Sequence, residues 1–157
     1  MNIQPKRILW PTDFSELAAQ GEKYASAIAE AFGAELHVIH VCQPLIGATA
    51  DLPLSPAVAI GITQKDLIDA AEARLKDLLT RDVREHRVAA CSVRVGNPWQ
   101  EICRYAEAEK IDLIVIGTHG YTGVRHVLIG SVAERVVQHA PCPVLTVKTN
   151  ERDFVQG

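Results

Sequence analysis

The feature that most constrains the fold of this chain is a regular alternation of short apolar runs with longer amphipathic ones. The apolar runs have the length and composition of strands and lie at residues 7–10, 36–41, 88–95, 112–116 and 144–147. Four segments of helical periodicity separate them, and these begin near Ser15, Thr63, Asn97 and Ser131. Strands that are apolar throughout are typical of a parallel sheet covered on both faces. We therefore expect an α/β fold, with an open parallel five-stranded sheet and helices on both faces, as in Rossmann-like proteins.

Local signals predict where the helices begin and end. Two segments have the pattern of a capping box, in which a hydroxyl residue caps the helix: Thr63-Gln64-Lys65-Asp66 and Ser131-Val132-Ala133-Glu134. Asn97 and Pro98 are residue types preferred at the N-cap and at the first helical position. Gly33 follows the first helical segment, as a C-terminal glycine should.

The length of 157 residues suits a single domain. We place this domain at residues 1–148 and treat residues 149–157 as a polar C-terminal tail. Residues 43–62 interrupt the alternation, because they contain three prolines and a single charged side chain. An irregular stretch of this length is either a mobile loop that covers a site for part of the time or a variable surface loop.

Composition limits the classes of partner and the cellular compartment that we expect. The formal net charge of −3 gives no general attraction for nucleic acid or for an anionic membrane. No apolar run approaches membrane-spanning length, and the first residues lack the pattern of a secretory signal. The four cysteines are far apart, which indicates reduced thiols rather than disulfides or a zinc site. We expect a cytoplasmic protein with no membrane or nucleic-acid partner.

A glycine-rich segment, residues 117–131, lies between the fourth strand-type run and the last helix. Glycines allow close backbone approach, and the free N–H groups of a helix start favour an anion such as phosphate. The segment is neither a Walker A loop nor a dinucleotide fingerprint. In parallel sheets, ligands bind at the carboxyl ends of the strands. Residues 11–13 and 117–119 both leave such ends, so they could face one crevice.

The pattern G-x2-G-x9-G-S, met at Gly117, Gly120, Gly130 and Ser131, resembles the ATP-binding branch of the universal stress protein family. The opening Ile8-Leu9-Trp10-Pro11-Thr12-Asp13-Phe14-Ser15 and the segments 95–98 and 139–145 resemble the same family. The resemblance covers the chain except residues 43–62 and the tail. It implies the strand order 3-2-1-4-5, with the crevice between the first and fourth strands.

The resemblance also implies a role for each position of an ATP site. Asp13 would hold the ribose hydroxyls, the backbone of Val41 would contact adenine, and Mg²⁺ or Mn²⁺ would bind through the phosphates. The ribose and phosphates would be lined by Gly117, His119 and Gly120, and the phosphates would be cradled by Gly130, Ser131, Val132 and Ala133. Pro11, Thr12 and Ile116 complete the expected binding set, which includes no catalytic residue and no metal ligand.

Several of these residues have plainer alternatives. Asp13 could form an Asx-turn or cap at the start of the first helix. Ser131 could cap its helix, a role that is compatible with phosphate contact through other atoms. His119 could be a surface turn residue.

These observations predict an ATP-binding universal stress protein that acts as a nucleotide-dependent stress-response or signalling module. A slow or partner-stimulated ATPase or nucleotide transferase is the alternative, and the chain offers no P-loop lysine for efficient phosphoryl transfer. A scaffold with a purely structural nucleotide is a third possibility.

The last strand-type run predicts a homodimer. In the implied strand order, Pro143–Lys148 lies at a sheet edge, where an apolar strand exposes unpaired backbone groups. Pairing with the same strand of a second copy would cover this edge. Alternatively, the tail could fold back, anchored by Phe154 and Val155.

Overall fold

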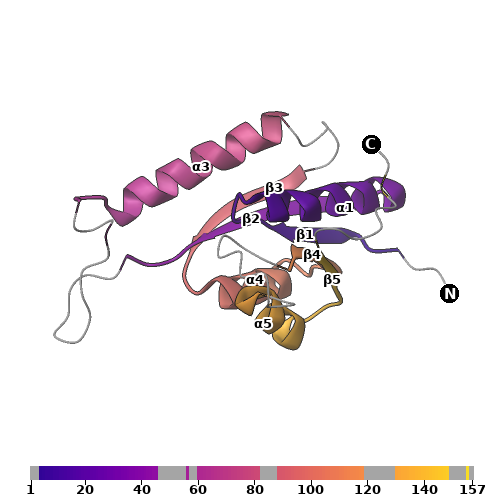
Figure 1. The fold of residues 1–157 in the computed structure, drawn as a ribbon. Helices are drawn as coiled ribbons and strands as arrows, with labels where there is room; N and C mark the ends of the chain where they lie inside the picture. The colour runs from indigo at the N-terminus through magenta and orange to yellow at the C-terminus, as the bar shows by residue number, and fades with distance from the viewer. Residues whose placement is uncertain are drawn as a thin grey trace.

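The computed structural model describes residues 4–45, 56, 60–81, 88–118, 130–148 and 155. They contain one parallel five-stranded sheet in the order β3-β2-β1-β4-β5, which confirms the predicted fold class and order (Figure 1). The strands are β1 (Arg7–Pro11), β2 (Glu35–Cys42), β3 (Val88–Val95), β4 (Leu113–Gly117) and β5 (Val144–Val147). The order reverses between β1 and β4, the point at which such sheets open a crevice.

Helices cover both faces of the sheet (Figure 1). They are α1 (Glu16–Phe32), α3 (Gln64–Arg81), α4 (Pro98–Ala108) and α5 (Ser131–His139). Side chains from alternate positions of β1 enter two cores. Ile8 and Trp10 pack with α1 and α3, and Leu9 packs with α4 and α5. This burial on both sides explains why the central strands are nearly all apolar, whereas the edge strand β3 has no fully buried residue.

Two helix starts follow the predicted capping chemistry. Ser15 is the N-cap of α1, and its hydroxyl accepts a hydrogen bond from the amide of Ala18. At α3, Asp66 Oδ2 accepts from the amide and the hydroxyl of Thr63, while the Asp66 amide donates to Thr63 Oγ1. The capping box at residues 63–66 is therefore confirmed. Gly33 ends α1 with φ 66°, the left-handed conformation expected there.

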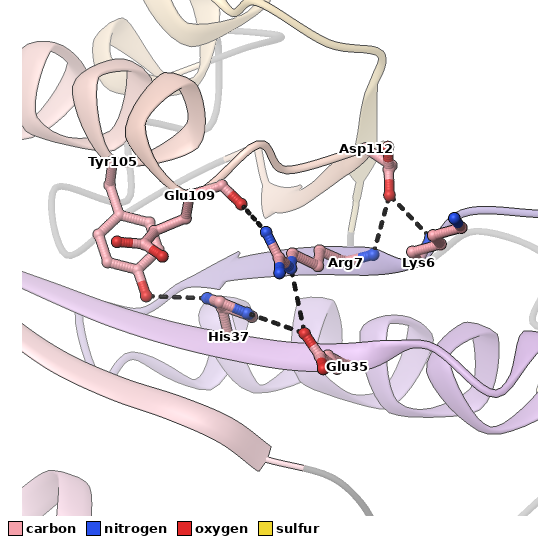
Figure 2. Close-up of polar contacts among 7 residues, drawn as sticks. All are labelled: Lys6, Arg7, Glu35, His37, Tyr105, Glu109 and Asp112. Carbon is pink, nitrogen blue, oxygen red and sulfur yellow. Dashed lines mark hydrogen bonds and ion pairs between the residues drawn. The ribbon is translucent and has the colours of Figure 1, made fainter.

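A polar cluster ties the amino-terminal ends of the strands together (Figure 2). Asp112 Oδ2 accepts from the amides of Lys6 and Arg7 at 2.7 and 2.9 Å. Arg7 also pairs with Glu35 at 3.1 Å. These bonds join β1 to β2 and to the turn before β4, at the end of the sheet opposite the carboxyl ends of the strands.

The buried side chain of His37 extends this cluster to α4. Its Nδ1 lies 2.9 Å from the hydroxyl of Tyr105 (Figure 2). Burial lowers the pKa of the imidazole.

No helix within the described residues is long and apolar enough to span a membrane.

Candidate functional site

A cavity of about 350 Å³ opens at the carboxyl ends of β1, β2 and β4, beside the first turns of α4 and α5. All of the predicted binding residues within the described parts of the chain line it. They are Pro11, Thr12, Asp13, Val41, Ile116, Gly117, Gly130, Ser131, Val132 and Ala133. His119 and Gly120 lie outside the described residues, as does most of the 43–62 loop. The topology therefore brings together residues that are more than a hundred positions apart in sequence.

Six further lining residues were not predicted: Ala18, Ile39, Gln43, Pro98, Ile102 and Thr118. Gln43 lies two positions after Val41, so the period-2 pattern of a strand could have indicated it. Pro98 and Ile102 come from α4, whose contribution depends on how that helix packs. The helical spacing of Ile102, Cys103 and Ala106 predicts the buried face of α4, but it does not predict which part of the sheet that face covers.

Asp13 forms the turn that was the plainer alternative for this residue. Its Oδ1 accepts from the Ser15 amide at 3.0 Å and from the Ser15 hydroxyl at 2.5 Å. Both bonds use the same oxygen, and Oδ2 has no partner among the described residues. One carboxylate can therefore stabilise the start of α1 and still offer an acceptor to the cavity.

The loop that carries Asp13 has a constrained backbone. Thr12 donates its amide to the carbonyl of Ile39 at 2.9 Å, and its hydroxyl accepts from the amide of Phe14 at 3.0 Å. Phe14 has φ 63°, a left-handed conformation that costs an L-residue roughly 1–2 kcal/mol. These hydrogen bonds hold the chain in a tight reversal between β1 and α1.

The start of α5 differs from the predicted capping box. The N-cap is Gly130, with φ −67° and ψ 152°, and no side chain caps the helix. Ser131 is already helical, so the prediction that it caps α5 was wrong by one position. A cap oxygen accepts from an amide two or three positions later, and Ser131 makes no such bond within the described residues.

This arrangement leaves hydrogen-bond donors at the cavity. The amides of Ser131, Val132 and Ala133 have no acceptor among the described residues, and all three residues line the cavity. The first intrahelical bond runs from the Glu134 amide to the Gly130 carbonyl. Unpaired amides at a helix start carry a partial positive charge and favour an anion.

Gly117 has a packing reason to be glycine. A Cβ at this position would lie 2.8 Å from the backbone oxygen of Leu17, at the first turn of α1. The missing side chain therefore lets β4 end directly against α1. A larger residue at position 117 would therefore require β4 or α1 to shift.

The cavity carries little side-chain charge in the described parts of the chain. Asp13 is the only ionisable residue in the described lining. The described residues also contain no group of three or more His, Cys, Asp or Glu side chains placed to hold a metal ion. The electrostatic character of this lining is thus set by one carboxylate and by the α5 amides.

Comparison with known proteins gives a consistent result. The model of the Universal stress protein family matches residues 5–148. Universal stress protein MJ0531 of Methanocaldococcus jannaschii is 36% identical over 151 residues, covering 94% of this chain and 85% of that protein. The structure of universal stress protein UspA from Lactobacillus plantarum has a TM-score of 0.74 and 30% identity, covering 93% and 99% of the two chains. The universal stress protein from Archaeoglobus fulgidus in complex with dAMP shares the fold, with a TM-score of 0.56, 22% identity and coverage of 94% and 100%.

Proposed function

Because the chain belongs to the universal stress protein family, we propose that it binds ATP in this cavity and acts as a nucleotide-dependent stress-response or signalling module. The observation that carries the proposal is that one cavity is lined by Asp13 and by three α5 amides that have no acceptor among the described residues. A carboxylate suits ribose hydroxyls, and helix-start amides suit phosphate. The A. fulgidus complex with dAMP indicates that this fold can accept an adenine nucleotide.

The backbone of β2 offers hydrogen-bonding groups for the adenine base. The Ile39 carbonyl accepts from Thr12 on the β1 side, and the Cys42 carbonyl accepts from Gly96 on the β3 side. Since peptide groups alternate in direction along a strand, Val41 directs its N–H and C=O toward β1, just past the last residue of that strand. Neither group has a partner among the described residues. An adjacent donor and acceptor match the N1 and N6 atoms of adenine, and Ile39 and Ile102 supply apolar surface beside them.

We further propose that Mg²⁺ or Mn²⁺ accompanies the nucleotide. The described residues offer no dedicated metal cage. A divalent cation would therefore be held mainly by phosphate oxygens and water, a common arrangement for Mg²⁺ with nucleotides.

A matched pair of variants at Ser131 tests the proposal. Proline is tolerated at the first helical position, and the extended ψ of Gly130 suits a residue before proline. Ser131→Pro removes one amide donor, whereas Ser131→Ala removes only the hydroxyl. We expect Ser131→Pro to weaken ATP binding, in isothermal titration with Mg²⁺, by about tenfold relative to Ser131→Ala. Equal affinities for the two folded variants, or no binding by the parent protein, would reject this site for ATP.

A further inference from the structure

The loop from Thr12 to Ser15 has a hollow on each side. One is the cavity described above, and the other, of about 310 Å³, lies between β1, α1 and α3. Thr12 lines both hollows, while Phe14 and Ser15 line the second. Thr12 is buried and Phe14 packs at the edge of the core, so specific contacts hold the loop between the two hollows.

His40 of β2 makes two of these contacts. Its Nδ1 lies 2.8 Å from the carbonyl oxygen of Thr12. A carbonyl can only accept, so Nδ1 carries the proton and donates. The His40 ring also packs on Phe14, with ring centroids 4.5 Å apart. The guanidinium carbon of Arg74, from α3, lies 4.4 Å from the centroid of the same Phe14 ring.

His40 lies on the other face of the sheet from most of the cavity. Val38, two positions earlier, packs in the core formed with α1 and α3, whereas Ile39 and Val41 pack on the α4 and α5 side. His40 is not part of the described cavity lining. The contacts that His40 makes toward the cavity are therefore with the Thr12–Phe14 segment, beside a charge interaction with Asp13.

We propose that His40 is a positioning residue that fixes Asp13 for nucleotide binding, through its hydrogen bond to Thr12 and its ring contact with Phe14. This inference rests on the proposed ATP site. The hydrogen bond fixes the peptide between Thr12 and Asp13, and therefore the direction of the Asp13 side chain. The ring contact stabilises Phe14 in its left-handed conformation, which the isolated backbone disfavours.

Three substitutions separate the two contacts. His40→Asn places an amide donor near the position of Nδ1 and removes the ring. His40→Phe keeps an aromatic ring and removes the donor, and His40→Ala removes both. Because the hydrogen bond fixes the peptide that leads into Asp13, we expect the donor to matter more than the ring.

The first readout is affinity for ATP with Mg²⁺ by isothermal titration. We expect His40→Phe and His40→Ala to bind about tenfold more weakly than the parent, and His40→Asn to stay within about threefold of it. Parent-like affinity in the Phe and Ala variants, or failure of Asn to restore binding, would overturn the assignment. The melting temperature of each variant shows whether it is folded, and His40→Asn remains informative if the Phe variant does not fold.

The second readout uses the empty protein, so it does not depend on the nucleotide. The amides of Phe14 and Ser15 donate to Thr12 Oγ1 and Asp13 Oδ1, and their hydrogen exchange reports the closed loop. We expect faster exchange at both amides in the Phe and Ala variants and parent-like exchange in the Asn variant. Unchanged exchange in all three would overturn the positioning role. If the parent does not bind ATP while exchange behaves as expected, the proposed function fails and the loop-positioning role of His40 stands.

Discussion

At the scale of single residues, Asp13 divides its two carboxylate oxygens between two tasks. Oδ1 holds the turn at the start of α1, and Oδ2 is left for the cavity. Asparagine has one oxygen that can take over the turn, but it lacks the negative charge. Substitutions of Asp13 can therefore separate its role in the turn from its role in ligand binding, the two alternatives that the sequence leaves open.

We expect Asp13→Asn to weaken ATP binding by about tenfold, because the charge-assisted hydrogen bonds to ribose are lost. Its melting temperature should stay within about two degrees of the parent, since the turn keeps its acceptor. Asp13→Ala loses the turn as well and should melt several degrees lower, about the effect of removing a cap from a domain of this size. Titration and thermal melts of both variants give the comparison. Parent-like ATP affinity in Asp13→Asn would leave only the turn role.

Ser131 shows the limit of sequence reasoning at this scale. The sequence correctly predicts a helix start rich in free amides, and the pattern Ser131-Val132-Ala133-Glu134 fits a capping box. Which residue becomes the N-cap depends on where the backbone changes from extended to helical, here at Gly130. At this position the Gly130 amide donates to the Thr118 carbonyl at the end of β4. The capping pattern in the sequence does not report this contact between two separate elements.

At the scale of elements, the pattern of apolar runs predicted every described strand to within two residues at either end. The bounds of β3 and β5 agree with the prediction, and β2 is one residue longer at each end. Burial on both faces makes the strands nearly all apolar, so their pattern is strong. The packing of α4 against the sheet is a different matter, because it depends on contacts between distant residues such as His37 and Tyr105.

The His37–Tyr105 contact between β2 and α4 leads to a prediction about pH. Burial lowers the pKa of His37, so the unfolded chain binds more protons than the folded one once the pH falls below about 6.5. Burial is the largest effect on this pKa; Glu109 and Glu35 raise it, and Arg7 lowers it. The stability associated with a neutral His37 is therefore fully present above that pH and is lost as the pH falls toward the folded-state pKa.

We expect the melting temperature of the parent to decline between pH 7.5 and 5, and this decline to be smaller in His37→Asn. An asparagine can still donate to or accept from the Tyr105 hydroxyl, but it does not titrate. The matched control is Tyr105→Phe, which removes the hydroxyl partner and keeps the buried imidazole of His37, so the decline should persist. An identical pH dependence in His37→Asn and the parent would contradict the prediction.

At the scale of the whole molecule, β5 is an edge strand of the sheet. The carbonyls of Pro143 and Val147 accept from the amides of Ile114 and Thr118, so these residues face β4. By alternation, Val144 and Thr146 direct their backbone groups to the free edge. We propose that a second copy pairs along this edge. Val155 of the tail packs against the core on the α1 side, which is the competing arrangement.

Proline substitutions at Val144 and Thr146 test this homodimer. Each removes an outward N–H and leaves the bonds to β4 intact, whereas the control Thr146→Val keeps its N–H. We expect light scattering at micromolar concentration to give a dimer for the parent and the control, and monomers for both proline variants. A monomeric parent rejects the dimer, and proline variants that remain dimeric place the contact elsewhere.

The donors that the start of α5 presents to the cavity are peptide groups, and this has a consequence for how the protein can evolve. Every amino acid except proline supplies the same N–H, so residues 131–133 can drift in identity while the donors persist. Asp13 has no such tolerance, because its contribution comes from a carboxylate. Within one site, the amide donors depend on the conformation of the backbone, whereas the carboxylate depends on the identity of residue 13. Divergent relatives can therefore change the side chains at the helix start and keep the backbone N–H groups that face the cavity.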